Sequence, residues 1–143
     1  MLSIAVDATG ITAVGLTSNS RYEEDLLPAQ AFILRYDLAG TLLWSEIFGS
    51  PDEDVAHGVV ADAAALTVTG HTYGSLDGPN KGASDVFVRR YDRAGKVVWA
   101  TQFGTSILVE CGQILSGQPH CAATRQIESS QQTKQRRLAG ATT

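Results

Sequence analysis

The sequence predicts an all-β fold of two four-stranded antiparallel units, followed by an irregular C-terminal tail. Two observations carry this prediction. The chain repeats itself with a period of 55, and each copy contains four short runs rich in β-branched and aromatic residues. Residues 3–50 align with residues 58–105 without a gap and share 15 identities in 48 positions. The phrase YDLAGTLLWSEIFG at 36–49 returns as YDRAGKVVWATQFG at 91–104.

Each copy resolves into four apolar runs separated by turn residues, and each run predicts a strand. In the first copy these runs are 2–7, 11–17, 31–37 and 41–48. In the second copy they are 55–62, 66–72, 85–92 and 96–103. Along residues 85–92 the apolar side chains alternate onto both faces, which predicts a strand that packs against neighbours on both sides.

The links between the runs predict how the strands connect. DLAG at 37–40 and DRAG at 92–95 each offer an Asp that opens a tight turn and a Gly for a positive φ, which favours an antiparallel hairpin. DATG at 7–10 has the same role, and its counterpart at 62–65 is DAAA. The link at 73–84 is long and glycine-rich, as is typical of a surface loop. Four such strands in each repeat indicate one blade of a β-propeller.

The second copy resembles the SBBP-type bacterial β-propeller repeat. Its motifs occur in order within 58–104: VADA, TVTGHT, GSLDG, DVFVRRYD and VVWATQFG. Residues 3–49 resemble the same repeat more loosely, with NSRYEEDLLPAQ in place of the glycine-rich loop, so the resemblance covers about residues 2–105. It implies repeated blades in large exported or surface-associated bacterial proteins, and therefore an extracellular or cell-surface location. It implies no shared catalytic residues.

These patterns divide the chain into three segments. Residues 1–50 form a first repeat that lacks the lead-in FGS…D, residues 51–105 form a second repeat, and residues 106–143 form a degenerate or disordered tail. All ten aromatic residues precede residue 104. Because a closed propeller uses about 4–8 blades, we expect the chain to be a piece of a longer array or to assemble with copies of itself.

Charge and composition argue against several partners. Residues 1–105 carry 7 Lys and Arg against 13 Asp and Glu, and no basic stripe that would bind nucleic acid. The sequence has no apolar run of the ~20 residues needed for membrane insertion. The start, MLSIAVDATG, lacks the basic and long apolar regions of a signal peptide. Cys111 and Cys121 could form a disulfide or remain two free thiols.

The repeated side chains are interpreted as structural. Trp44 and Trp99 could form a stacking platform for a sugar, but their place in strands packed on both sides favours a core role. The pairs Tyr36/Tyr91 and Phe32/Phe87 receive the same interpretation. Arg35 and Arg90 recur beside Asp37 and Asp92; they could bind an anion, and we favour ion pairs at a blade edge or a solvated rim.

The sequence predicts no metal site and no catalytic residues. Oxygen-bearing side chains occur in two places, which are Asp52, Glu53 and Asp54 before the second copy, and Asp77, Asn80 and Asp85 in its loop. In the second group Pro79 stands where a calcium loop needs a ligand, and no bidentate Glu follows at the required spacing. The acidic run at 52–54 is interpreted as a solvated loop. His57 and His71 occur in the second copy alone, and Cys111, Cys121 and His120 are too few for zinc. The segment KQRR at 134–137 is interpreted as a solvated end.

The sequence therefore predicts a non-catalytic structural or binding module that belongs to a larger repeat protein and uses no cofactor. Its partners would be itself or further propeller repeats, and protein or carbohydrate bound through the loops. Two alternatives stay open, which are a fragment of a propeller-based hydrolase or lyase and a truncated product without independent function. The copies differ most in the loops at 18–29 and 73–84, so binding specificity is expected there.

Overall fold

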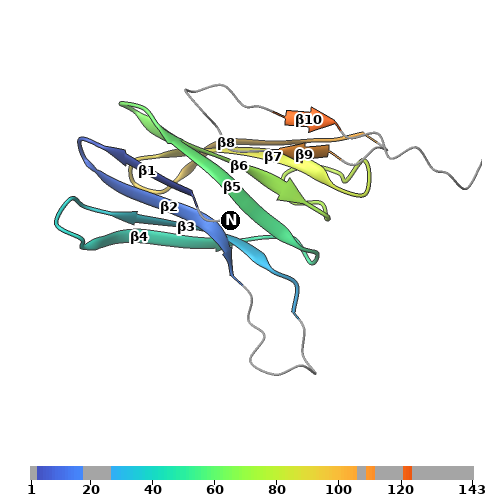
Figure 1. The fold of residues 1–143 in the computed structure, drawn as a ribbon, viewed down its shortest axis with the longest axis horizontal. Helices are drawn as coiled ribbons and strands as arrows, with labels where there is room; N and C mark the ends of the chain where they lie inside the picture. Colours follow the sequence, from blue (N-terminus) through green and yellow to red (C-terminus); the bar gives the residue numbers. More distant parts are fainter. Residues whose placement is uncertain (1–2, 18–26, 106–108, 112–120, 124–143) are drawn as a thin grey trace, which may run out of the picture.

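The computed structural model describes residues 3–17, 27–105, 109–111 and 121–123, the last two ranges by their backbone alone. Within these residues the chain forms strands and no helix (Figure 1), and hence no helix that could cross a membrane. All eight expected strands are present, and no bound differs from the expected one by more than one residue. They are β1 (Ser3–Asp7), β2 (Gly10–Thr17), β3 (Gln30–Tyr36), β4 (Leu42–Phe48), β5 (Asp54–Ala61), β6 (Ala65–Thr72), β7 (Asp85–Asp92) and β8 (Val97–Phe103).

The strands form two four-stranded antiparallel sheets, ordered β1-β2-β3-β4 and β5-β6-β7-β8. The second sheet repeats the register of the first. Arg35 lies opposite Trp44 and Arg90 lies opposite Trp99, and the register shifts directly after each arginine. In β5, a bulge between Ala56 and Gly58 leaves His57 without a partner in the ladder.

The hairpin chemistry expected from the sequence is confirmed. Asp37 Oδ1 accepts hydrogen bonds from the amides of Ala39 and Thr41, at 2.9 and 2.8 Å. Gly40 then takes a φ of +88°, a conformation that other L-residues rarely adopt. In the second sheet the carboxylate of Asp92 accepts from the amide of Lys96, and Gly95 has a φ of +87°. Both turns join neighbouring antiparallel strands, as the DxAG pattern requires.

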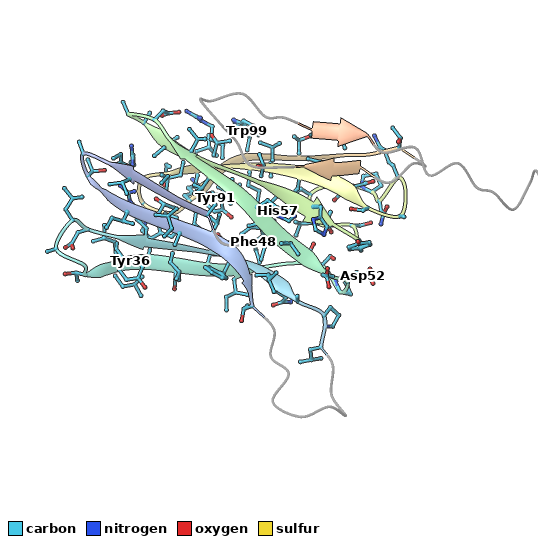
Figure 2. All side chains as sticks on the ribbon, in the orientation of Figure 1. Tyr36, Phe48, Asp52, His57, Tyr91 and Trp99 are labelled. Carbon is cyan, nitrogen blue, oxygen red and sulfur yellow. The ribbon has the colours of Figure 1, made fainter. Side chains whose placement is uncertain are left out.

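The hydrophobic core lies between the two sheets, which stack face to face with β5 crossing β1, β2 and β3. Figure 2 shows Phe48 and Tyr91 between the sheets. The Phe48 ring meets Phe87 edge-on with 5.7 Å between centroids, and Trp44 stacks on Tyr91 at 6.0 Å. Trp44 also donates its indole N–H to the carbonyl of Arg93 at 3.0 Å. Smaller aliphatic side chains fill the rest, namely Val14, Ala31, Ile33, Ala56, Val59, Leu66 and Val68.

Arg89 adds a charged contact to this apolar interface. Its guanidinium carbon lies 4.3 Å from the centre of the Phe48 ring, a cation–π arrangement. One of its nitrogens lies 3.6 Å from the carboxylate of Glu46 on the first sheet. Arg89 therefore binds both an aromatic ring and a carboxylate across the interface.

The tail is not wholly irregular, which corrects part of the expectation. Val109–Cys111 (β9) pairs antiparallel with Cys121–Ala123 (β10), and the register sets Cys111 opposite Cys121. The first residue of β9, Val109, stands at the repeat position of Asp54, the first residue of β5. β9 contacts β6 and β7 just as β5 contacts β2 and β3. β9 therefore lies where the first strand of a third repeat would begin. The remaining residues of the tail lie outside the described ranges.

The repeat supplies a matched test of this interface. Replacing Trp44 with Ala removes a ring packed against the second sheet, so we expect the free energy of unfolding to fall by about 3 kcal/mol. The same change at Trp99, whose side chain is 46% exposed, should cost below about 1 kcal/mol. Urea unfolding followed by far-UV circular dichroism, at the lowest practical protein concentration, measures both. Equal losses would contradict the assignment of Trp44 to the core.

Candidate functional site

The loops and turns lie on two opposite rims of the stacked sheets (Figure 1). We call residues 7–10, 37–41, 62–65 and 92–96 the turn rim, and residues 27–29, 49–53 and 73–84 the loop rim. The loop rim is tied together by backbone hydrogen bonds from Asp54 to Ala29 and from Tyr73 to Glu53. It has a hollow of about 280 Å³, lined by Thr17, Leu27, Pro28, Gln30, Ile47, Ser50 and Pro51.

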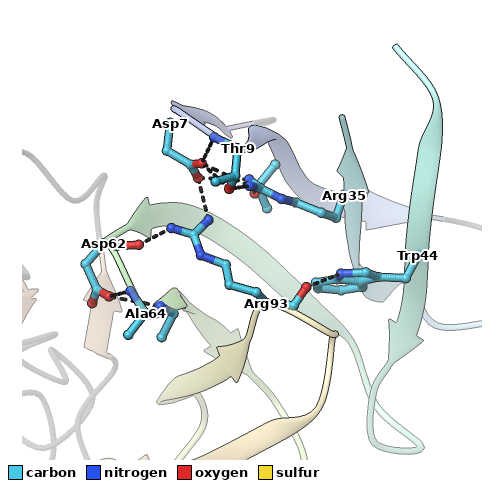
Figure 3. Close-up of polar contacts among 9 residues, drawn as sticks. Asp7, Thr9, Arg35, Trp44, Asp62, Ala64 and Arg93 are labelled. Carbon is cyan, nitrogen blue, oxygen red and sulfur yellow. Dashed lines mark hydrogen bonds and ion pairs between the residues drawn. The ribbon is translucent and has the colours of Figure 1, made fainter. Parts of the chain in front are cut away.

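On the turn rim, a buried arginine organises a polar network (Figure 3). Arg35, only 1% exposed, donates to both carboxylate oxygens of Asp7 at 3.0 Å each. It also donates to the hydroxyls of Thr12 and Thr9, at 2.7 Å each. The hydrogen bond from Arg35 is the main reason that the pKa of Asp7 lies far below its usual value. Charge-assisted bonds of this kind hold the β1–β2 turn onto β3.

Arg93 links this network to the second sheet. Its guanidinium lies 2.6 Å from Asp7 Oδ2 and donates to the backbone carbonyl of Asp62. A hollow of about 350 Å³ separates the two turns, with Asp7, Asp62 and Arg93 in its lining. The first repeat has Leu38 at the position of Arg93, so this bridge is made once.

The expected ion pairs of Arg35 and Arg90 are therefore present, but with other carboxylates than their sequence neighbours. Arg90 pairs with Asp62 at 2.7 Å, just as Arg35 pairs with Asp7. Asp37 and Asp92 instead accept bonds within their own hairpins. Both arginines thus bind carboxylates within their own repeats and stabilise the fold.

The two arginines also form a matched pair for mutagenesis. Arg35→Met leaves the partly buried Asp7 carboxylate without its main partner, and we expect a loss of about 3 kcal/mol in the free energy of unfolding. Arg90→Met removes a pair whose carboxylate is 48% exposed, so the loss should stay below about 1 kcal/mol. Thermal and urea unfolding at neutral pH measure both variants. A larger loss for Arg90→Met would contradict the structural role of Arg35.

On the loop rim, Gln102 holds the 73–84 loop in place. Its side-chain oxygen accepts from the amides of Leu76 and Asp77, at 2.9 and 3.0 Å. Its side-chain nitrogen donates to the carbonyl of Gly74 and to Asp85 Oδ2, both at 2.9 Å. Gln102 was not among the residues predicted from the sequence, although its replacement by Ile47 in the first repeat distinguishes it.

The oxygen-bearing side chains of this loop are engaged by the protein. Both oxygens of Asp77 accept from Arg89 at 2.7 Å. Asn80 donates to the carbonyl of Tyr73 and accepts from the amide of Gly82. Asp85 is fully buried and also accepts from the amide of Lys81. These bonds shape the loop, and no cluster of three or more metal-ligating side chains occurs in the described part of the chain.

The acidic run at 52–54 is only partly the solvated loop that was expected. Asp52 and Glu53 are exposed. Asp54 is fully buried, and its carboxylate accepts from both the amide and the hydroxyl of Ser50. Asp54 therefore closes the 50–54 turn that joins the two sheets.

The bulge in β5 brings His57 against His71, a contact that the sequence does not predict. His57 Nε2 and His71 Nδ1 lie 2.6 Å apart, and the rings stack with 4.8 Å between centroids. Tyr73 meets His71 edge-on at 5.4 Å. Burial, followed by the nearby His71, lowers the pKa of His57 to about 4. At neutral pH the imidazole of His57 is thus neutral, and it shares one hydrogen bond with His71.

This histidine pair predicts a pH dependence of stability. The folded-state pKa of His57, about 4, lies below the unfolded value of 6.5, so the unfolded chain binds more protons between these values. Stability should therefore fall as the pH is lowered through this window, by about 1 kcal/mol after solvent screening. His57→Gln should remove this part of the loss. Urea titrations near pH 7 and pH 4.5 compare the variant with the wild type, and equal losses would refute the assignment.

The repeated aromatic residues divide between the core and the outer faces. Trp44, Phe87 and Tyr91 pack between the sheets, as expected for core residues. Trp99 is exposed instead, and Tyr36 is only partly buried, because both lie on faces that point away from the interface (Figure 2). Phe32 is also only partly buried. The side chains of Cys111 and Cys121, His120 and the segment 134–137 lie outside the described residues.

Comparison with protein-family models finds no match to this chain, and comparison with curated proteins finds no similar sequence. The resemblance to the SBBP-type repeat therefore stays a prediction that rests on the motifs within residues 2–105. The repeat, the stacked sheets and the two rims are what any functional proposal must use.

Proposed function

We propose that the chain is a non-catalytic structural and binding module, formed by two consecutive β-propeller blades of the SBBP-repeat type within a larger repeat assembly. One observation supports this above all others. The face of the second sheet that packs on the first is the repeat equivalent of the outward face of the first sheet. If every further repeat packs in this way, sheets can be added at both ends of the stack, as in a repeat array.

The charged groups of the rims support a scaffold role. Asp7 is bound by Arg35 and Arg93, and Asp77 is bound by Arg89. The bond from Arg35 holds the pKa of Asp7 far below its usual value, so Asp7 is a poor general acid at neutral pH. We therefore assign these residues to the packing of the module.

Ligand binding is proposed for the 73–84 loop. Gln102 and Asp85 hold its backbone, so the exposed positions between them can vary without unfolding the sheet. Tyr73 is 43% exposed at the start of this loop. An ordered loop that carries an exposed aromatic ring suits a protein or carbohydrate ligand.

Adding one more repeat tests the scaffold role. We would join a copy of residues 51–105 directly after residue 105, with its own Trp changed to Phe and with Trp44→Phe in the first repeat. The added unit should stack on the second sheet and shield Trp99. We expect acrylamide quenching of Trp99 fluorescence to fall at least about twofold and the unfolding midpoint to rise, since a further face is buried. The control is the same fusion separated by a long Gly/Ser linker.

An added unit that unfolds separately from the first two, with quenching of Trp99 unchanged, would refute the proposed role. Comparison of the direct fusion with the long-linker fusion then distinguishes a stacking failure from a strained connection.

A further inference from the structure

The outward face of the first sheet exposes aliphatic side chains that a packed repeat would bury. Ile4 is 59% exposed and Val6 is 66% exposed on β1. Their repeat equivalents, Val59 and Ala61, face the first sheet, and Val59 is only 6% exposed. The outward face of the first sheet is therefore built like a face that receives another sheet.

The outward face of the second sheet has the complementary features. Trp99 and Phe103 are 46% and 42% exposed. Their equivalents, Trp44 and Phe48, are the two rings that the first sheet inserts into the internal interface. The second sheet thus presents the same pair of rings partly exposed, on the sheet whose β6 and β7 also contact β9.

The first repeat also has the aromatic residues that would contact the rings of Trp99 and Phe103 from another copy. Inside the chain, Trp44 stacks on Tyr91 and Phe48 meets Phe87. The repeat equivalents of Tyr91 and Phe87 are Tyr36 and Phe32, which are the same residue types. Both lie partly buried on the outward face of the first sheet. Both aromatic contacts could therefore form again between the free faces of two copies.

A pair of glycines supports the same arrangement. A Cβ atom on Gly95 would lie 2.7 Å from the ring of Trp44, so the indole needs a glycine beneath it. The equivalent Gly40 has nothing within 4 Å of such a Cβ atom. The turn at Gly40 thus offers the space into which the indole of Trp99 from another copy would fit.

The charges are compatible with this contact as well. Across the internal interface Glu46 meets Arg89, and the equivalents of these two residues are Thr101 and Leu34. Both partners of the ion pair are replaced together, so neither face would bury an unpaired charge there. The contact between copies would be more apolar than the internal one.

We infer that two copies of this chain bind head to tail, with the outward face of the second sheet of one copy packed on the outward face of the first sheet of the next. This inference rests on the proposed stacking of repeats. The contact is heterologous, so copies form a closed ring or an open filament according to the rotation between them. A ring of 4–8 blades would take about 2–4 copies.

The position of β9 agrees with the addition of another sheet to the outward face of the second sheet. β9 is equivalent to the start of β5, and the equivalent of β1 comes later, from residue 58 onward. β9 therefore lies where the chain would lead into the next sheet. A second copy would supply that sheet with its own β1 to β4.

Complementary single-face variants of the full 143-residue chain test the inference. Trp99→Glu places a charge on the outward face of the second sheet, and Val6→Glu places one on that of the first. Sedimentation velocity over a concentration series should show association of the wild type. Each variant alone should associate at least about tenfold more weakly, because a carboxylate would be buried without a partner.

Mixing the two variants should restore one contact, since each keeps one intact face. The mixture should give a dimer that grows no further. The matched control is Val98→Glu, an exposed β8 position next to Trp99 whose side chain points to the other side of the sheet; it should associate like the wild type. Circular dichroism confirms the fold of each variant.

A wild-type chain that stays monomeric throughout the series would overturn the inference, as would a mixture that forms no dimer. If the covalently added repeat stacks while the free chain stays monomeric, the proposed function stands and only self-association is refuted. If the added repeat does not stack either, both fail.

Discussion

The packing of the two sheets against each other is the constraint on which the rest of the structure depends. Trp44 and Phe48 project from the first sheet and contact Tyr91 and Phe87 on the second. A four-stranded sheet alone would leave one apolar face in water, so neither repeat can bury its core without the other. The turns and loops keep their geometry because this interface holds the strands that they connect.

The second repeat makes additional polar contacts at positions where its sequence differs from that of the first. Arg89, Arg93 and Gln102 all stand where the first repeat has an aliphatic residue. The two arginines bind carboxylates of the first sheet, and Gln102 holds the loop at 73–84. Polar side chains at these positions make directional contacts that an aliphatic residue cannot make. The proposed binding role of this loop depends on that difference.

The strands and hairpins were predictable because their causes are local. Alternating side chains and the DxAG turns act within a few residues, and both repeats follow them. The partners of Arg35 and His57 were not predictable in this way. Arg35 binds Asp7, which lies 28 positions away in the sequence. His57 contacts His71 because of a bulge that no local sequence pattern predicts. Trp99 shows a further difficulty, because a repeat position does not say whether a neighbouring sheet is present.

The sequence by itself determined the repeat period, the number of strands per repeat and the chemistry of the turns. These features follow from side-chain alternation and backbone preference, which act over short stretches of chain. Only the tertiary structure decided which face of each sheet is buried and which carboxylate each arginine binds. These choices depend on contacts between segments far apart in the chain. The same tryptophan is therefore a core residue in one repeat and an exposed one in the next.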